Sequence, residues 1–181
     1  MATSTAPAIG KLGQALNFDG VDDFVLVSTN PSLDMDNFSY QAWVKVRSLQ
    51  TSGSKFIEGD NVAGNEVTLQ ALPTDNLAQF NVTDNNLISA TALGTSNIND
   101  NAWHHLVGIK DGGNNVYIYV DGALEGSGSA SFSGSFSGQT YRIGTSVDGG
   151  ARFTDGLIDD VRIYNRALSA REILKLYNAG K

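Results

Sequence analysis

The chain has 181 residues, of which 41% are hydrophobic and 17% charged, and its formal net charge is −7. This length and apolar content suit one globular domain with a well-formed core, or at most two small ones. Without a basic stripe to neutralise phosphates, we expect no nucleic-acid partner. The absence of cysteine excludes disulfide scaffolds and thiolate zinc sites, and no apolar run approaches the ~20 residues needed for membrane insertion.

The first eleven residues differ in character from the rest of the chain. They are rich in Thr, Ala and Pro and lack the apolar stretch of a signal peptide. We interpret residues 1–11 as a linker remnant from a longer secreted protein, and we expect one domain over residues 12–181. The predicted localisation is therefore secreted or extracellular.

Segments in which apolar and polar residues alternate dominate the chain, as expected of strands with one buried face. Asp121-Gly122, between two such segments, predicts a type I′ hairpin, because both central positions of that turn need positive φ. The predicted strands lie at Asp23–Ser28, Phe38–Val46, Lys55–Glu58, Glu66–Ala71, Ala78–Val82, Trp103–Lys110, Asn115–Val120, Ala123–Gly126, Tyr141–Thr145 and Leu157–Tyr164.

A single helix is predicted, near the end of the chain. Ser169 and Glu172 have the spacing of a capping box, and Gly180 stands where a C-terminal cap would lie. The Ser/Gly-rich stretch from 126 to 138 contains Phe132 and Phe136, so we expect a long loop or a weak edge strand anchored by two rings. The predicted fold class is all-β, a two-sheet antiparallel β-sandwich (jelly roll) with one short C-terminal helix.

Five motifs occur in the order typical of laminin-G-like, concanavalin A-like domains. They are Leu16–Val25, Phe38–Val44, Trp103–Val107, Tyr119–Gly122 and Gly156–Ser169. The chain resembles the bacterial branch of this family over residues 12–178. The resemblance implies a jelly roll, usually with a structural calcium, of the kind found as modules in secreted glycoside hydrolases, lyases and adhesins.

The candidate metal ligands are Asp19, Asp159 and Asn37. The first and last strands of such a sandwich lie side by side, which would bring Asp19 close to Asp159. The alternation that turns Val161 and Ile163 inward also turns Asp159 inward, and an inward carboxylate needs a partner or a metal. We therefore expect a structural Ca²⁺ bound by these aspartates and the turn at Asn37. Turn capping is the alternative role for such aspartates.

His104 and His105 are the only histidines, and we expect structural roles for both. Neighbouring residues on a strand point to opposite faces, so the two imidazoles cannot bind one metal ion together. Trp43 and Trp103 could serve as platforms for sugar stacking. Both lie within predicted strand motifs, so we expect both in the core.

No catalytic constellation is present. The chain lacks the E-x-D-x-x-E strand of related glucanases, the Gln-x-His strand of related lyases and a G-x-S-x-G elbow. We therefore predict that the protein is not an enzyme. Binding of hydroxyl-rich ligands needs amides, carboxylates and an aromatic or two. The candidate ligand-binding residues are Asp60, Asn61, Glu66, Gln70, Gln79, Asn81, Tyr141 and Arg152, with Thr68 and Arg142 beside them.

For each of these polar residues, an ordinary solvated surface is the alternative. The predicted function is a non-catalytic carbohydrate-binding module that directs a secreted polysaccharide-degrading protein to its glycan. The partner would be a polysaccharide or oligosaccharide, with a neutral glycan favoured by the acidic charge, and the domain would be tethered in a larger multidomain chain. The alternative function is an adhesion or protein-interaction module of a large cell-surface protein, and a structural spacer is a third possibility.

Overall fold

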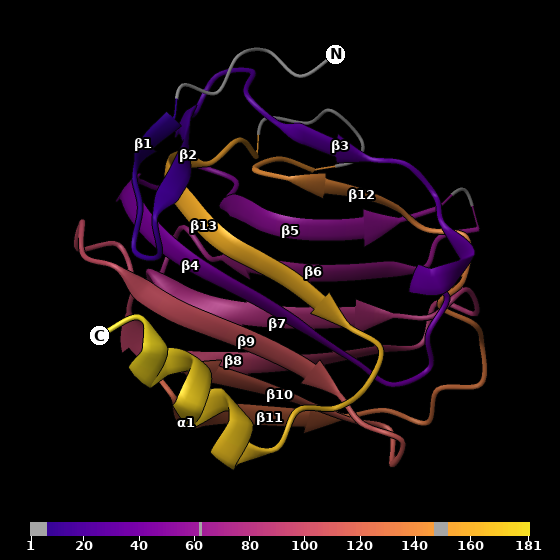
Figure 1. Cartoon of the computed structure of the whole chain (residues 1–181). Helices are drawn as coiled ribbons and strands as arrows, with labels where there is room; N and C mark the ends of the chain where they lie inside the picture. Colours follow the sequence, from indigo (N-terminus) through magenta and orange to yellow (C-terminus); the bar gives the residue numbers. More distant parts are fainter. Residues whose placement is uncertain (1–6, 62, 147–151) are drawn as a thin grey trace.

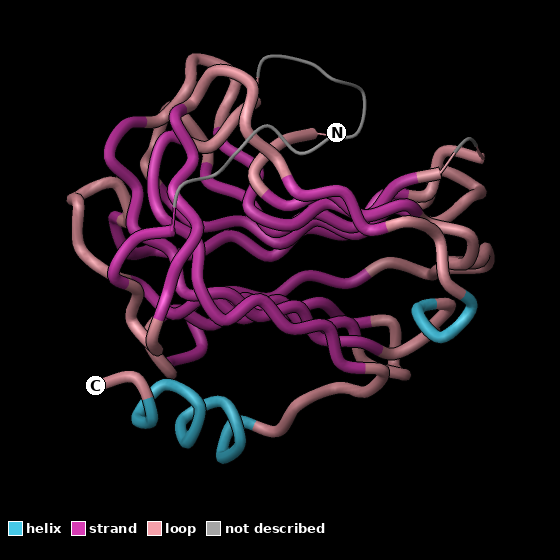
Figure 2. The backbone as a smooth tube through the Cα atoms, turned by 45° about the horizontal axis from the view of Figure 1, so that its top comes forward, coloured by secondary structure: helices cyan, strands magenta, loops and turns pink. Residues whose placement is uncertain are grey.

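Two antiparallel sheets pack face to face in the computed structural model, which describes residues 7–61, 63–146 and 152–181 (Figure 2). The seven-stranded sheet has the order β1 (Pro7–Ile9), β2 (Gln14–Asp19), β13 (Asp155–Tyr164), β4 (Phe38–Ser48), β9 (His104–Lys110), β10 (Asn115–Val120) and β11 (Ala123–Ser129). The six-stranded sheet has the order β3 (Val25–Val27), β12 (Thr140–Ile143), β5 (Ser54–Asp60), β6 (Glu66–Ala71), β7 (Leu77–Thr83) and β8 (Ser89–Asn97). The predicted sandwich is confirmed.

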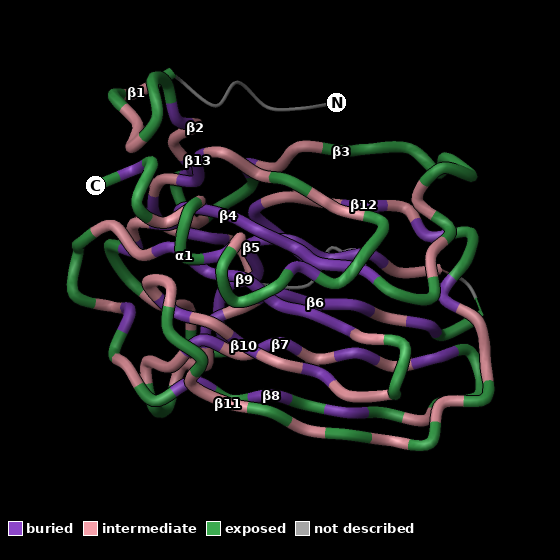
Figure 3. The backbone as a smooth tube through the Cα atoms, turned by 60° about the horizontal axis from the view of Figure 1, so that its bottom comes forward, coloured by how far each residue is buried: buried purple, intermediate pink, exposed green. Residues whose placement is uncertain are grey.

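Alternating burial along the strands separates an inner face from an outer face (Figure 3). Along β7, Ala78, Phe80 and Val82 are buried, whereas Gln79 and Asn81 between them are half-buried. The buried side chains of one sheet pack against the buried side chains of the other sheet, because every second residue of a strand points to the same face. The core therefore lies between the sheets.

Three strands, β1, β2 and β8, were not predicted. Residues 7–9, which we expected within a linker, form β1 and pair with β2. The segment that forms β8 is rich in Ser, Thr and Ala and has no large apolar residue apart from Leu93. Its inner positions are filled by Ala90 and Ala92, both buried, so its alternation is present but its hydrophobic signal is weak.

The predicted turn chemistry is confirmed between β10 and β11. Asp121 and Gly122 have φ values of 50° and 83°, as the type I′ hairpin requires. The ring anchoring of the long loop after β11 is confirmed as well. Phe132 and Phe136 stack edge to face at 5.4 Å, and each ring lies 5.1 Å from the ammonium group of the buried Lys110.

The single α-helix among the described residues, α1 (Ala170–Ala179), covers part of the outer face of the seven-stranded sheet (Figure 1). Its capping box is formed as predicted, with reciprocal bonds between Ser169 and Glu172. The buried Ile173 packs against Val107 and Ile109 of β9. A 3₁₀ turn, η1 (Pro31–Leu33), precedes β4. No helix formed by the described residues is long and apolar enough to cross a bilayer.

One edge of the sandwich is tightly closed. There β11 of one sheet runs against β8 of the other, and a Cβ added at Gly126 would lie 2.0 Å from the carbonyl oxygen of Leu93. Glycine is needed here because the two backbones approach so closely. The carboxylate of Glu125 also accepts hydrogen bonds from the backbone amides of Thr95 (2.7 Å) and Ser96 (3.0 Å). This edge therefore binds the two sheets together.

Candidate functional site

The outer face of the six-stranded sheet carries a continuous set of polar side chains, which we call the polar face. Successive strands bring them into register, since Glu58 pairs with Thr68, Thr68 with Asn81, and Asn81 with Thr91. The helix lies on the other sheet, so α1 does not cover this surface (Figure 2). The residues of the polar face are Lys55, Glu58, Asp60, Glu66, Thr68, Gln70, Gln79, Asn81, Thr83, Ser89, Thr91 and Arg142.

One half of the polar face is charged. The ammonium group of Lys55 bridges two carboxylates, that of Glu58 and, at 3.0 Å, that of Glu66. Thr68 donates a further bond of 2.6 Å to Glu66. Burial raises the pKa of Glu66, but the bonds from Thr68 and Lys55 outweigh this and leave the pKa lowered. Lys55 and Glu58 are each 3% exposed, so this ion-pair cluster is largely buried and stabilises the sheet from within the domain.

The other half is neutral and consists of amides and hydroxyls. Gln70 donates to Gln79 across β6 and β7. Asn81 accepts from Thr91 at 2.9 Å and donates to Thr83 at 3.3 Å. These mutual bonds fix the half-buried amide side chains. None of the polar-face residues is aromatic, so this half offers hydrogen bonding and no ring for stacking.

The predicted positions of the candidate ligand-binding residues are partly correct. The structure brings Asp60, Glu66, Gln70, Gln79 and Asn81 together on one face, and Asp60 pairs directly with Glu66. Asn61, Tyr141 and Arg152 need separate accounts, given next. Lys55, Glu58, Thr83, Ser89 and Thr91 were missed. Simple alternation would place Lys55 and Glu58 on opposite faces, and a register shift between Lys55 and Ile57 brings both to the outer face; β8 itself was not predicted.

Tyr141 was wrongly assigned to the surface. It is 1% exposed and lies between the sheets, where two acceptors, the carbonyl of Leu33 (3.3 Å) and Gln139 Oε1 (3.0 Å), lie within reach of its single hydroxyl proton. Asn61 holds the loops together, accepting from the amide of Ala63 at 2.8 Å and donating to the carbonyl of Ser137 at 2.7 Å.

Two arginines lie near the charged half of the polar face. Arg152 is half-buried, and its carbonyl accepts from the amide of Lys55 at 3.3 Å. The guanidinium of Arg142 lies 5.3 Å from the ring centre of Phe24 and donates to the carbonyl of Ser146 at 3.0 Å. Only Arg142 projects from a strand of the polar face, at the position that pairs with Glu58.

The predicted metal ligands are not brought together. The first and last strands are paired as expected, but the register places Asp19 opposite Asp155, with Asp159 four residues further along β13. Asp159 accepts bonds of 2.7 Å from the amides of Leu12 and Asp160, at the other end of β2. Asn37 lies in the turn before β4 and lines a separate polar pocket with Asp34 and Asp36.

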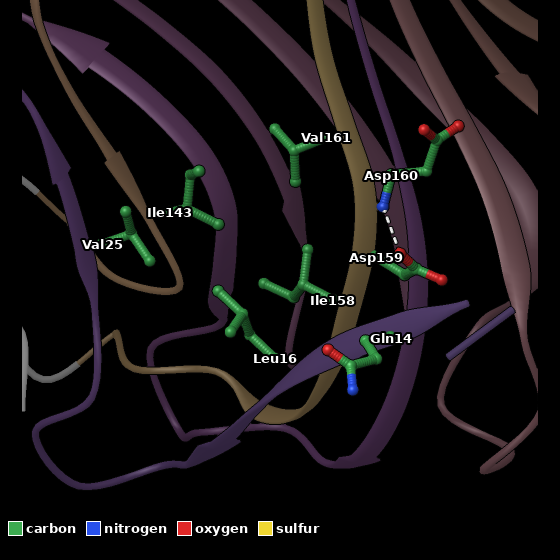
Figure 4. Close-up of a pocket in the computed structure, with 8 residues that line it drawn as sticks. All are labelled: Gln14, Leu16, Val25, Ile143, Ile158, Asp159, Asp160 and Val161. Atoms are coloured by element: carbon green, nitrogen blue, oxygen red, sulfur yellow. Dashed lines mark hydrogen bonds between the residues drawn. The ribbon is translucent and has the colours of Figure 1, made fainter. Parts of the chain in front are cut away.

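A β-bulge explains the error at Asp159. The pairing of β13 with β4 shifts between Asp159 and Arg162, and Asp160 has a φ of 47°. The inserted residue changes the phase, so Ile158 and Val161 face the core and Asp159 does not. Figure 4 shows these two apolar side chains beside an apolar cavity of about 190 Å³, with the carboxylates of Asp159 and Asp160 pointing away from it.

Asp19 belongs instead to an acidic turn with Asp22 and Asp23. One carboxylate oxygen from each of the three lies within 4.8 Å of the others. Bonds within the turn hold them, since Asp19 accepts from the amide of Val21 at 2.8 Å and Asp23 accepts from the amide of Asp19 at 3.2 Å. Three hard oxygen donors are the chemistry that Ca²⁺ prefers, so this donor set fits a calcium ion.

The two tryptophans have different environments. Trp43 is 1% exposed and lies on the outer face of the seven-stranded sheet beneath α1, next to the ring of His105. Trp103 precedes β9 and is only half-buried, so its assignment to the core is wrong. His104 is held between Asp100 and Asp121, at 3.1 and 2.9 Å.

Solved structures share this architecture. The chain is similar to domain 4 of AbnA, a GH43 extracellular arabinanase from Geobacillus stearothermophilus in complex with arabinotriose, at 22% identity and a TM-score of 0.79, covering 97% of this chain and 82% of that one. It is also similar to the binding domain of Paraclostridial Mosquitocidal Protein 1, at 15% identity and a TM-score of 0.77. That match covers 99% of this chain and 47% of the other, so the chain spans about half of that domain.

A third similar structure is the heptameric SAP-like pentraxin from Limulus polyphemus, at 15% identity and a TM-score of 0.71, with 89% and 80% of the two chains covered. Identities this low show the fold alone. The family is shown by the sequence itself, because residues 19–174 match one family over most of the chain. The chain belongs to the concanavalin A-like lectin/glucanases superfamily.

Proposed function

We propose that this domain is a non-catalytic carbohydrate-binding module that directs a secreted polysaccharide-degrading protein to its glycan. The observation that carries the proposal is the polar face, on which amides, hydroxyls and carboxylates are held in register and which α1 does not cover; Lys55, Glu58 and Thr68 are buried, whereas Gln70, Gln79 and Asn81 are half-buried. Hydroxyl-rich ligands are recognised by such groups through directed hydrogen bonds. The similarity to an arabinanase domain with bound arabinotriose supports the same class of ligand.

The neutral half of the polar face is the proposed position of the sugar chain. Gln79 and Asn81 lie side by side on β7, in the middle of that half, and each already bonds to a neighbour. Their orientation is therefore fixed before a ligand arrives, which lowers the entropy lost on binding. Without an aromatic platform, we expect weak to moderate affinity.

The Gln79→Ala, Asn81→Ala double variant should bind glycans at least about tenfold more weakly, because each lost hydrogen bond contributes roughly 0.5–1.5 kcal/mol. Pull-down on insoluble polysaccharides and a glycan array would identify the ligand, and titration calorimetry would give the affinities. Lys45→Ala, on the outer face of the other sheet, is the matched control and should bind normally. Normal binding by the double variant, or binding to a protein partner and to no glycan, would contradict the proposal.

We further propose a structural calcium at the acidic turn of Asp19, Asp22 and Asp23. The three carboxylates would supply part of the shell, and their mutual repulsion would be relieved by the ion. When bound, the ion would stabilise the link between β2 and β3. It has no proposed role in chemistry.

Calcium at about 100 times its Kd should raise the Tm by roughly 5–10 °C, because ligand binding to the folded state adds about 2.7 kcal/mol. Asp23→Asn should abolish this rise. Asp159→Asn is the control, and its Tm should still respond to calcium, since its carboxylate bonds to backbone amides elsewhere. Melting curves with calcium and with chelator that coincide for the wild-type protein would refute the site.

A further inference from the structure

His105 lies fully buried beneath the C-terminal end of α1, on the outer face of the seven-stranded sheet. Its imidazole packs against the indole of Trp43, at 5.1 Å between ring centres, and against the ring of Tyr177 on the helix, at 6.2 Å, and those two rings also stack on each other at 5.7 Å. The last turn of the helix is closed on this stack, since a Cβ added at Gly180 would lie 2.5 Å from the indole. Any displacement of His105 would therefore disturb the packing of α1 on the sheet.

Neither ring nitrogen of His105 has a hydrogen-bond partner among the described residues, and nor does the indole nitrogen of Trp43. A neutral imidazole buried in this way already leaves one donor and one acceptor unsatisfied. A protonated imidazole would place two donors and a full charge in the same apolar space, at a much larger cost. The packing thus accepts only the neutral form.

The charged groups around His105 do not compensate for this burial. Asp121, at the turn after β10, accepts the backbone amide of His105 at 2.9 Å and favours a positive charge, whereas Arg162 on β13 opposes one. The ammonium groups of Lys11 and Lys181 lie about 5 Å from the two flanking rings and add positive charge on the outside. Burial dominates and lowers the pKa of His105 to about 4.

The pKa of His104 shifts in the opposite direction, although His104 is the neighbouring residue. The hydrogen bond to the carboxylate of Asp121, at 2.9 Å, raises the pKa of His104, burial lowers it, and the bond to the carboxylate of Asp100, at 3.1 Å, raises it again, for a net increase. The two histidines therefore form a natural pair for comparison. Protonation of His104 stabilises the folded domain, whereas protonation of His105 destabilises it.

We propose that His105 makes the docking of α1 acid-sensitive, so that protonation of its buried ring releases the last turns of the helix from the sheet. Above the ordinary titration range of histidine, docking is fully stable. As the pH falls, the released state gains a proton that the docked state resists, so the stability of docking is lost progressively. With a folded pKa of about 4 against about 6.5 for a solvated ring, the released population should rise roughly 100-fold between pH 7 and pH 4.

Amide hydrogen exchange followed residue by residue would test this proposal. Protection factors, which correct for the intrinsic pH dependence of exchange, should fall roughly 100-fold for the amides of residues 173–180 between pH 7 and pH 4. The protection factors of amides in β5, β6 and β7 should stay unchanged over the same pH range. His105→Phe, which keeps an apolar ring but cannot be protonated, should remove most of the fall. His104→Gln, the matched control, should leave the fall in place.

Two results would overturn the proposal. One is an equal loss of protection in α1 and in the six-stranded sheet, which would mean that acid unfolds the whole domain. The other is an undiminished fall in His105→Phe. If that variant does not fold, NMR titration of the imidazole in the wild-type protein decides: a pKa near 6.5 with α1 still protected refutes the mechanism, and titration that coincides with loss of α1 protection supports it.

Discussion

Phe80→Ala is expected to lower the free energy of unfolding by about 3–5 kcal/mol. The ring is fully buried on the inner face of β7 and packs edge to face with Tyr40 at 5.8 Å and with Phe38 at 6.5 Å. Its removal would leave a cavity between the sheets that the rigid strands cannot close. Equilibrium unfolding in urea measures the loss directly, provided that the m-value is unchanged.

A second substitution makes this prediction specific. A Cβ added at Gly108 on β9 would lie 2.1 Å from a ring carbon of Phe80, so Gly108→Ala alone should cost about 1–3 kcal/mol by overpacking. In the Phe80→Ala background, the new methyl group enters the cavity instead. The double variant should therefore be more stable than the sum of the two losses implies. Additivity within about 0.5 kcal/mol would contradict the assigned contact.

Asp84→Ala should destabilise the domain by on the order of 3 kcal/mol at pH 7. The carboxylate is fully buried after β7 and accepts four backbone amides, from Asn86 (3.0 Å), Ile88 (2.9 Å), Ser133 (3.0 Å) and Gly134 (2.7 Å). Two of these amides belong to the long loop after β11. The substitution would orphan all four at once, so the loop and the β7–β8 turn should lose their order together.

The loss should also depend on pH. Burial raises the pKa of Asp84, but its four amide bonds outweigh burial and leave the pKa lowered. The stability that the Asp84 carboxylate contributes is therefore fully present above the ordinary pKa of an aspartate. It is lost as the pH falls through the lowered pKa that Asp84 has in the folded state. Unfolding at pH 7 and pH 3 should show a smaller difference between wild type and Asp84→Ala at the lower pH. The exposed Asp75→Ala is the control, and a change there above about 0.5 kcal/mol would undermine the comparison.

The fold was predictable because apolar and polar residues alternate with a period of two along a strand. This signal is strong wherever large apolar residues occupy one face. The segment that forms β10 shows this, with Val116, Ile118 and Val120 all buried. The alternation was too weak to predict β8. Its inner positions are occupied by Ala90 and Ala92, which are small, so the segment has the composition of a loop. The signal failed for β1 because three residues are too few to show a period.

The candidate site was harder to predict, for reasons that particular residues make clear. Asp159 was given the wrong face by a bulge, and nothing in the local sequence marks the insertion of one residue. Tyr141 carries a hydroxyl that suggested the surface, yet its partners in the core come from distant segments such as Leu33. By contrast, Gln79 and Asn81 were placed correctly, because the buried Ala78 and Phe80 fix their phase.

Trp43 links the two ends of the domain. Lys11, near the start of the described chain, lies 5.0 Å from its ring, and Gly180, near the end, is in contact with the same indole. The polar face lies on the opposite sheet. A domain built in this way can be spliced between two neighbours, or into a surface loop of a host protein, without increasing the distance between the flanking segments. Its proposed glycan-binding surface would then point away from the junction, which makes the fold suitable for transplantation into other proteins.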